Sequence, residues 1–433
     1  MTLRFANYLP LLVLLLIISC ERDFSPLKIK EPDPRFHLSL RQAGATEMWL
    51  TLTLDSSNLG DEFEIMRDQL IIFKDTVNVK DTLVYDRFLQ PLRSYTYYAY
   101  HIKEDKRIAT VTFTVTFTVK TLDTTSHHID WEIDTIGTFQ SFLTDVWGTD
   151  ENNVYAVGII RRSSYPTVTN IIHWNGVEWE AIDFLEGDLN SIYGFGPDDI
   201  WVVGDGGGQQ ALIAHWDGSV WNTLELQQYE RLIAVWGTSN SNLYAVGWNG
   251  TILHYDGNNW TKMESGTEKP LYDVWGVSSS NVYVVGYDPS TSRGIMLSLI
   301  ENGWETVIET DTHPSSQRPH GDLQSVWALD KDNIYVTGTT TFQLILGKWE
   351  KTYLPVDLTA LYKIRGNNMA NIFIIGGFGL IIHYSGLNWR LVEDYHQTYG
   401  PILRGVWSFG EKTFIVGYTG DGSARGIVLR GNH

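Results

Sequence analysis

The sequence predicts an all-β protein in which a small sandwich precedes a ring of seven four-stranded blades. Short runs of alternating apolar and polar residues fill residues 36–122, and no helical period competes with them. The second part of the chain repeats one pattern seven times. The 39 glycines and the 13% share of aromatic residues also suit short strands joined by tight turns.

The start of the chain has the pattern of an export signal. Residues 1–19 carry one basic residue, Arg4, then an apolar run from Leu9 to Ile18 that is too short to cross a bilayer comfortably, and Cys20 follows. This resembles the signal peptide and lipobox of bacterial lipoproteins. The resemblance implies that Cys20, the only cysteine, is acylated and that residues 20–35 form a tether. The alternative is a plain secretory signal followed by a chance cysteine.

The expected anchor and the charge restrict the partners. A lipid on Cys20 implies the bacterial cell envelope, with the outer membrane as the expected site and its periplasmic or surface face left open. The formal charge is −19, and loss of Arg4 with the signal makes it one unit more negative. Nucleic acid and anionic lipid surfaces are therefore poor partners, and we expect no nucleic-acid partner. Thiol catalysis is excluded, because the sole thiol would be acylated.

Residues 36–122 predict the sandwich, and one segment in them is distinctive. Pro91 follows Leu89 and precedes Tyr95, which begins an alternating strand. This segment resembles the E–F corner of fibronectin type III domains, which implies a hydrogen bond from the Tyr95 hydroxyl to backbone upstream. We expect a fibronectin type III-like spacer that residues 123–128 join to the second part.

From about residue 139 the chain repeats a unit of four strands. Each unit has a first strand with Trp-Gly, a second ending in Gly, a third ending in His and an aromatic residue, and a fourth led by Trp, with local departures. Four strands in about forty residues make one propeller blade. Residues 129–433 are therefore predicted to form a seven-bladed β-propeller, which resembles the tryptophan- and glycine-rich propellers of exported bacterial proteins rather than WD40 repeats. The glycines that end the second strands are Gly158, Gly204, Gly247, Gly286, Gly338, Gly376 and Gly417.

The seventh unit is incomplete. It breaks off after Arg430 and lacks the strand led by Trp. Residues 129–136, just ahead of the first unit, have the pattern of that strand around Trp131. We expect residues 129–136 to complete blade seven, so that the two ends of the domain lock the ring and hide its sheet edges.

Four histidines at one position of the repeat are the candidates for a metal site. They stand on the third strands of four blades, which places them about 10 Å or more apart, whereas the ligands of a zinc ion lie about 2 Å from one point. We therefore predict no metal and expect hydrogen bonds between blades instead. We expect the recurrent tryptophans to pack between blades. The histidines are His173, His215, His254 and His383.

Loop length predicts one ligand-binding face. Variation concentrates in the connections between second and third strands and between blades, and in a propeller both kinds emerge on the same face. Long surface loops usually carry binding groups. The candidate residues are Arg161, Arg162, Tyr165, Trp248, Tyr287, Arg293, His313, Arg318, His320, Tyr395, His396, Tyr399 and Arg425.

We therefore expect a non-catalytic recognition protein without cofactors, anchored in the envelope, whose partner is a glycan or an envelope or extracellular protein. Aromatic faces would stack on the partner and arginines would donate hydrogen bonds to it. Two alternatives stay open, a scaffold lipoprotein in envelope assembly and a polysaccharide hydrolase or lyase. No catalytic residue is predicted, but the 51 acidic residues offer many carboxylate pairs that no spacing rule selects.

Overall fold

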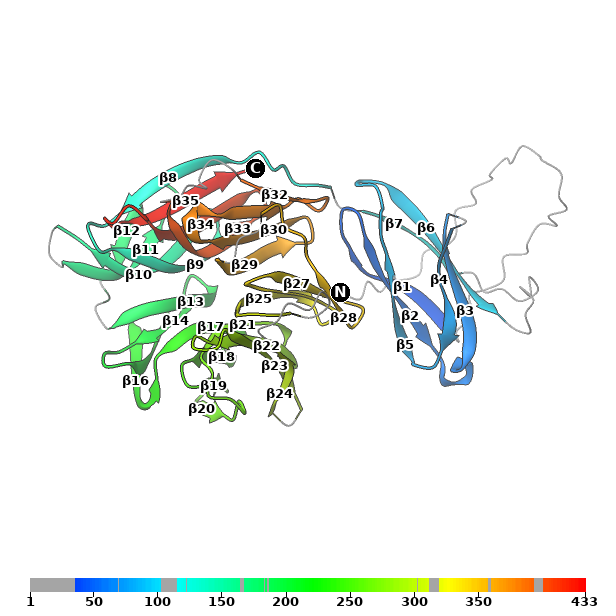
Figure 1. The fold of residues 1–433 in the computed structure, drawn as a ribbon, viewed down its shortest axis with the longest axis horizontal. Helices are drawn as coiled ribbons and strands as arrows, with labels where there is room; N and C mark the ends of the chain where they lie inside the picture. The colour runs from blue at the N-terminus through cyan, green and yellow to red at the C-terminus, as the bar shows by residue number, and fades with distance from the viewer. Residues whose placement is uncertain are drawn as a thin grey trace. The chain divides into compact units, whose positions relative to one another are not determined.

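The computed structural model forms two compact units, one within residues 1–122 and one of residues 123–433 (Figure 1). It describes residues 36–68, 70–102, 115–121, 123–163, 167–182, 184, 187–301, 303–310, 319–356, 360–392 and 400–433. No helix in this described part is long and apolar enough to span a membrane. Cys20 lies outside the described residues, so the lipid anchor stays a prediction.

The first unit contains two antiparallel sheets that share one core. The core joins Leu50 of one sheet to Phe63 and Tyr97 of the other. The Tyr95 hydroxyl accepts a hydrogen bond from the backbone nitrogen of Gln90, at 2.7 Å. One sheet has the order β1 (Phe36–Ala43), β2 (Met48–Leu54), β5 (Asp81–Asp86), and the other has the order β4 (Leu70–Val77), β3 (Asp61–Arg67), β6 (Ser94–Ile102), β7 (Val115–Lys120). A short 3-10 helix, η1 (Ser56–Asn58), precedes β3.

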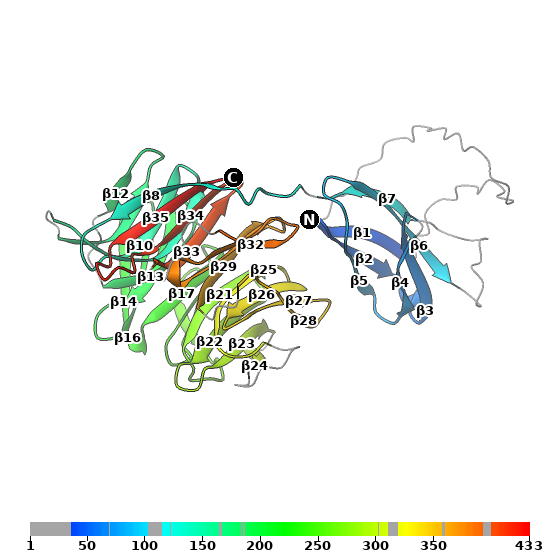
Figure 2. The same ribbon diagram turned by 45° about the horizontal axis from the view of Figure 1, so that its top comes forward.

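The second unit consists of seven four-stranded antiparallel sheets around one axis (Figures 1 and 2). We call them blades 1 to 7 in chain order, and the strands of each blade are named from the innermost outward. Blade 1 has β9 (Phe142–Asp150), β10 (Asn153–Arg161), β11 (Val168–Trp174) and β12 (Trp179–Ile182), and blade 2 has β13 (Asp188–Gly196), β14 (Asp199–Asp205), β15 (Gln210–Trp216) and β16 (Trp221–Glu230). Blade 3 has β17 (Leu232–Ser239), β18 (Asn242–Gly247), β19 (Ile252–Tyr255) and β20 (Trp260–Met263), and blade 4 has β21 (Leu271–Ser278), β22 (Asn281–Asp288), β23 (Arg293–Ile300) and β24 (Gly303–Glu309).

The remaining blades follow the same order. Blade 5 has β25 (Leu323–Asp330), β26 (Asn333–Gly338), β27 (Thr341–Ile345) and β28 (Lys348–Lys351), and blade 6 has β29 (Leu361–Asn368), β30 (Asn371–Gly376), β31 (Ile381–Tyr384) and β32 (Trp389–Leu391), with the 3-10 turn η2 (Gly377–Gly379) between β30 and β31. Blade 7 has β33 (Ile402–Phe409), β34 (Lys412–Tyr418), β35 (Gly426–Asn432) and β8 (Asp130–Ile136). Each innermost strand contacts that of the next blade, and β33 contacts β9, so the ring is closed.

Strand β8 completes blade 7 from the other end of the domain. It pairs antiparallel with β35, from Asp130 opposite Asn432 to Ile136 opposite Gly426. This is the pairing that the sequence led us to expect for residues 129–136.

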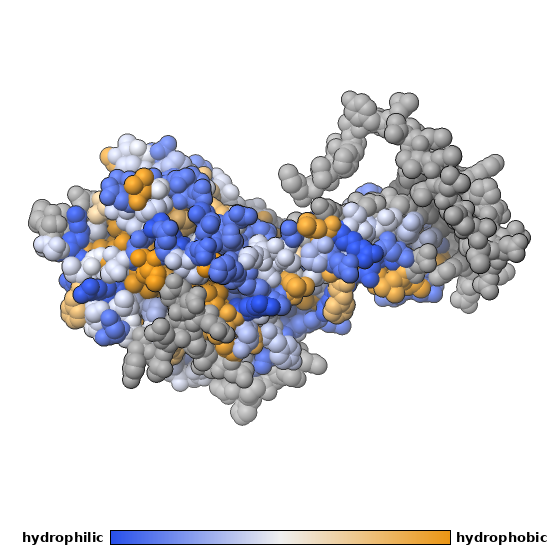
Figure 3. Space-filling model, turned by 90° about the horizontal axis from the view of Figure 1, so that it is seen from above, coloured by the Kyte–Doolittle hydropathy of each residue, from blue (hydrophilic) through white to orange (hydrophobic). Residues whose placement is uncertain are grey.

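On the side seen in Figure 3, hydrophobic residues form small scattered areas between hydrophilic ones, as is normal for a protein surface.

Arg430 ties three strands together at the closure. Its Nε donates to Asp134 of β8 at 2.7 Å, and its guanidinium lies 4.2 Å from the centre of the Trp174 ring in blade 1. Trp179 of blade 1 also donates to Asp134, from Nε1 at 3.0 Å. One cation and one carboxylate thus join the closing strand to β35 and to the first blade.

Four outer-strand tryptophans pack on the preceding blade, as predicted for residues that lie between blades. Each of these four approaches an aromatic residue on the second strand of that blade, with ring centroids 5.8 to 6.4 Å apart. The seam between blades 7 and 1, where the ring closes, is one of the four. The pairs are Trp179 with Phe414, Trp260 with Trp201, Trp304 with Tyr244, and Trp389 with Tyr335.

The repeated histidines bond within their own blades, so the expectation of bonds between blades was wrong. Each imidazole lies 2.6 to 3.0 Å from an Asn or Asp that stands at the start of the second strand of the same sheet. Each ring also stacks on an aromatic side chain of that second strand. Within the described ranges, no group of three His, Cys, Asp or Glu side chains could hold a metal ion.

His383 of blade 6 has two further histidine neighbours. Its Nδ1 lies 3.1 Å from Nδ1 of His127, in the segment before β8, and its ring centroid lies 5.1 Å from that of the C-terminal His433. Burial, together with His433 and His127, lowers the pKa of His383 to about 2. Burial also lowers the pKa values of His127 and His433.

We predict that acid weakens this cluster. A histidine in the unfolded chain titrates near pH 6.5, whereas these three stay neutral to lower pH in the folded protein. Protonation therefore favours unfolding, and stability should fall as the pH drops below about 6.5 toward the lower pKa values of the folded state. The measurement is the melting temperature between pH 7.5 and 5.

The substitution His383→Gln should reduce this acid sensitivity. Blade 5 already has Gln343 at the equivalent position, where its amide donates to Asn333 at 2.9 Å. His215→Gln is the control, because His215 occupies the same position in blade 2 and bonds Asp199. Equal loss of melting temperature on acidification in wild type and His383→Gln would contradict the interpretation.

Candidate binding face

Aromatic side chains fill the centre of the ring. Six of the seven innermost strands carry a Trp or Tyr at one equivalent position, and five of these rings contact one another with centroids 6.2 to 6.5 Å apart. The contact of Trp275 with Trp407 joins blade 4 to blade 7 across the axis. Burial raises the pKa of Tyr193 to about 12. The five rings in contact are those of Trp147, Tyr193, Trp236, Trp275 and Trp407, and the sixth residue at this position is Trp327 of blade 5.

Blade 6 has Arg365 at this position instead. Its guanidinium lies 4.6 Å from the centre of the Trp275 ring and forms two hydrogen bonds with Asp273, at 2.8 and 2.9 Å. Lys363 also contacts Asp273, at 3.1 Å. Burial alone would raise the pKa of Asp273, but the charges of Arg365 and Lys363 lower that pKa to about 2. The carboxylate is therefore charged and fully engaged in holding blades 4 and 6 together.

Two carboxylates on the innermost strands also join adjacent blades. Asp273 accepts a hydrogen bond from the Ser325 hydroxyl of blade 5, and Asp145 accepts one from the Ser191 hydroxyl of blade 2, at 2.7 Å. Both are buried. These carboxylates have structural partners, and we assign them no catalytic role.

Stacked arginines mark the face where the second strands end and the innermost strands begin. Arg231, just before β17, lies 4.2 Å from the centre of the Trp248 ring, and Arg404 of β33 lies 4.3 Å from that of Tyr362 in β29. Between them, Tyr272 of β21 stacks on Tyr287 of β22, with centroids 4.7 Å apart. We call these residues the axial arc: Arg231, Trp248, Tyr272, Tyr287, Tyr362 and Arg404.

The two arginines of the arc differ from the other well-packed arginines of the chain. Arg67, Arg365 and Arg430 pair with carboxylates. Among the described residues, Arg231 and Arg404 have ring partners but no carboxylate partner, and Nε of Arg231 is buried without a hydrogen-bond partner. Within the described residues, no carboxylate therefore competes with a ligand for these two guanidinium groups.

The arc is polar and partly buried. All six side chains are half-buried. Burial, followed by the adjacent Tyr287, raises the pKa of Tyr272, so this hydroxyl stays protonated at neutral pH. The arc therefore offers flat aromatic surfaces and N–H and O–H donors in fixed positions.

The structure distributes the predicted residues unevenly. Trp248 and Tyr287 belong to the arc. Arg161, Arg293 and Arg425 are exposed at the ends of connections in blades 1, 4 and 7. Arg162 is half-buried in the same connection as Arg161, and His320 packs its ring against Phe342, with centroids 5.7 Å apart. The others lie outside the described residues: Tyr165, His313, Arg318, Tyr395, His396 and Tyr399.

Four residues of the arc were not predicted from the sequence: Arg231, Tyr272, Tyr362 and Arg404. A comparison of the seven innermost strands could have found three of them, because they follow the leucine that begins the repeat. At that position other blades have the smaller or aliphatic residues Thr144, Asn190, Ile233 and Gln324. Two tyrosines and an arginine at one repeat position are the signal that was available.

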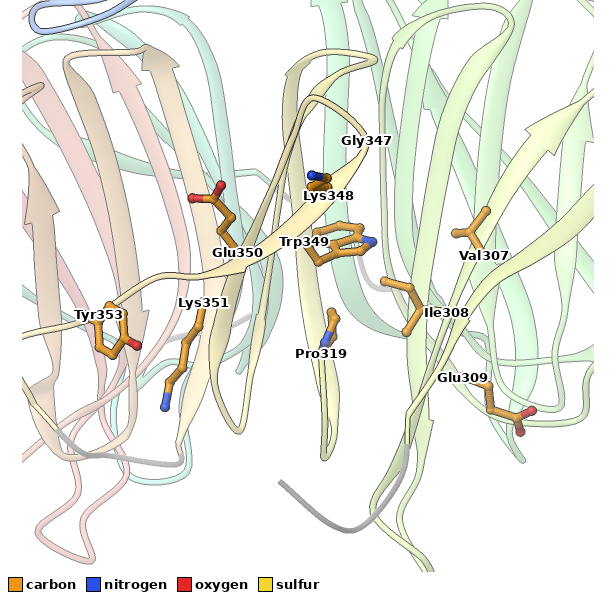
Figure 4. A pocket seen from close by; sticks show the side chains of 10 residues that line it. All are labelled: Val307, Ile308, Glu309, Pro319, Gly347, Lys348, Trp349, Glu350, Lys351 and Tyr353. Carbon is orange, nitrogen blue, oxygen red and sulfur yellow. The ribbon is translucent and has the colours of Figure 1, made fainter. Parts of the chain in front are cut away.

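A separate cleft of about 900 Å³ lies between the outer strands of blades 4 and 5 (Figure 4). Trp349 and Ile308 line it, and Tyr353 and Val307 at its walls are 82% and 49% exposed. Two glutamates and two lysines line the cleft, so it favours neither an anionic nor a cationic ligand. They are Glu309, Lys348, Glu350 and Lys351.

The closed ring of seven sheets is a β-propeller, and comparison with solved structures agrees. A structure described as YCF48 bound to D1 peptide has 16% sequence identity, covers 72% of this chain and 97% of its own, and superposes with a TM-score of 0.52. The WD40 β-propeller domain of Doa1 has 12% identity, covers 71% and 98%, and has the same TM-score. At these identities the likeness shows the fold alone. No family model and no curated protein matches the chain.

We predict that Asp273→Asn destabilises the propeller by about 3–5 kcal/mol, because it leaves Arg365 and Lys363 as uncompensated cations beside the buried centre. Asp145→Asn is the control, since Asp145 accepts hydrogen bonds and has no cation partner among the residues described. It should cost about 1–2 kcal/mol. Denaturant unfolding measures both, and equal losses would contradict the assignment.

Proposed function

We propose that this protein is a non-catalytic binding protein, tethered in the bacterial cell envelope through Cys20, whose propeller binds an extended segment of another protein at the axial arc. The observation that carries the proposal is the pair of stacked arginines, Arg231 on Trp248 and Arg404 on Tyr362. Both guanidinium groups are oriented before any ligand arrives.

Preformed stacking favours binding. A guanidinium that lies flat on an aromatic ring keeps its N–H donors at its edge and loses little rotamer freedom when a ligand binds. Donors of this kind suit carboxylates and backbone carbonyls of an extended chain. The net charge of the chain is −19. In such a chain, Arg231 and Arg404 are local positive sites that can select carboxylates and carbonyls, because no carboxylate among the described residues pairs with them.

A peptide is favoured over a glycan as the partner. The similar propeller YCF48 was solved with a D1 peptide bound, which supports peptide binding by this fold. A glycan is the second candidate, because Trp248, Tyr287 and Tyr362 offer flat faces on which sugar rings stack. The guanidinium donors of Arg231 and Arg404, which have no carboxylate partner among the described residues, match charged or carbonyl oxygens better than sugar hydroxyls.

The first unit completes the proposal as a spacer. We propose that it is a fibronectin type III-like domain, which its three- and four-stranded sheets and the hydrogen bond between Tyr95 and Gln90 support. In this proposal it separates the propeller from the membrane that holds Cys20.

We predict that Arg231→Gln and Arg404→Gln each weaken partner binding about tenfold, because each removes charge-assisted hydrogen bonds. The measurement is affinity capture from an envelope fraction, followed by titration of the captured protein. The comparison variant changes Arg161, Arg293 and Arg425 to Ala, which tests the more exposed part of the same face. Unchanged binding when Arg231 and Arg404 are both replaced by Gln would reject the arc as the site, and so would glycan-array binding that this double substitution does not weaken.

The anchor has its own test. We expect Cys20→Ser to abolish incorporation of labelled fatty acid and to move the protein from the membrane fraction to the soluble fraction, because no other cysteine is present. Retention of label or of membrane association in Cys20→Ser would refute the anchor.

A further inference from the structure

One turn of blade 6 holds an aromatic residue in an unfavourable conformation. In η2, between β30 and β31, Phe378 has φ of +59°. Its side chain is 49% exposed. Bulky residues rarely adopt this left-handed region, because Cβ crowds the following carbonyl.

The equivalent turn of blade 3 shows that the backbone does not require a phenylalanine. Both turns have the same four backbone hydrogen bonds. In blade 3 they run from Gly247 to Thr251, Thr251 to Trp248, Trp248 to Arg231, and Gly250 to Lys269, and in blade 6 from Gly376 to Leu380, Leu380 to Gly377, Gly377 to Ala360, and Gly379 to Pro401.

The residue that corresponds to Phe378 in blade 3 is Asn249, with φ of +52°. Asparagine tolerates this conformation better than other residues with a side chain, because its short polar group bonds locally. Blade 6 therefore uses a residue that is worse for stability both in its backbone conformation and in its exposed apolar surface. Such strain is typical of binding sites.

Phe378 lies beside the blade 6 and blade 7 part of the axial arc. A Cβ on Gly377 would be 3.6 Å from the Tyr362 hydroxyl, so the turn runs along that side chain. The turn also contacts β33, which carries Arg404. An exposed apolar ring, a tyrosine and an arginine without a carboxylate partner among the described residues thus share one corner of the face.

We propose that Phe378, Tyr362 and Arg404 form a subsite for a large apolar side chain that stands next to a carboxylate in the bound segment. The apolar side chain packs on Phe378, and the carboxylate accepts hydrogen bonds from Arg404. This rests on the proposed function of the arc and names the ligand chemistry that its blade 6 side selects.

The test begins with random dodecapeptides displayed on phage and selected on the full chain in detergent. Wild type should enrich peptides with Phe, Trp or Leu adjacent to Asp or Glu. Phe378→Asn, which copies blade 3, should weaken binding of an enriched peptide at least about tenfold. The same variant should raise the melting temperature by about 1–2 °C, because it relieves the left-handed strain.

Leu387→Asn is the matched control. Leu387 is 58% exposed in the turn between β31 and β32, at the opposite end of the same blade, and its replacement should leave peptide affinity unchanged. Full affinity in Phe378→Asn, a lowered melting temperature, or enriched peptides without acids would each overturn the subsite alone. Failure to enrich any peptide would overturn the proposed function, and the subsite with it.

Discussion

Antiparallel pairing of β8 with β35 holds the propeller closed, because it joins the two ends of the domain within one sheet. Among the described strands, those of every other blade follow one another directly along the chain. Arg430 extends this pairing to blade 1 through Asp134 and the Trp174 ring. The positions of all innermost strands, and of the side chains they carry on the binding face, depend on that closure.

Inside the ring, aromatic contacts and one buried ion-pair network both join the blades. Trp275 and Trp407 meet across the axis, and Arg365 takes the place of a tryptophan in blade 6. Asp273 balances that cation within a buried network. The arginines of the axial arc lack such a balance among the described residues, which distinguishes a cation that stabilises the fold from the cations that we propose contact a ligand.

The repeat made the propeller predictable, since strand period, turn residues and the missing seventh outer strand are all local patterns. The bonding of the histidines was not predictable in this way. Their partners, such as Asn153 for His173, are set by the register between two strands of one sheet. Arg404 and Tyr362 of the arc were missed for a related reason. The stacking of Arg404 on Tyr362 joins two blades, and no single unit of the sequence contains both residues.

The placement of both domain ends in blade 7 also decides how the propeller bears force. A pull on the chain ahead of β8 runs along that strand and loads its hydrogen bonds with β35 in parallel, so that they must shear together rather than open one by one. The hydrogen bond from Arg430 to Asp134 also joins β35 to β8. If the proposed tether at Cys20 transmits tension, the sheet of blade 7 is the first to bear it.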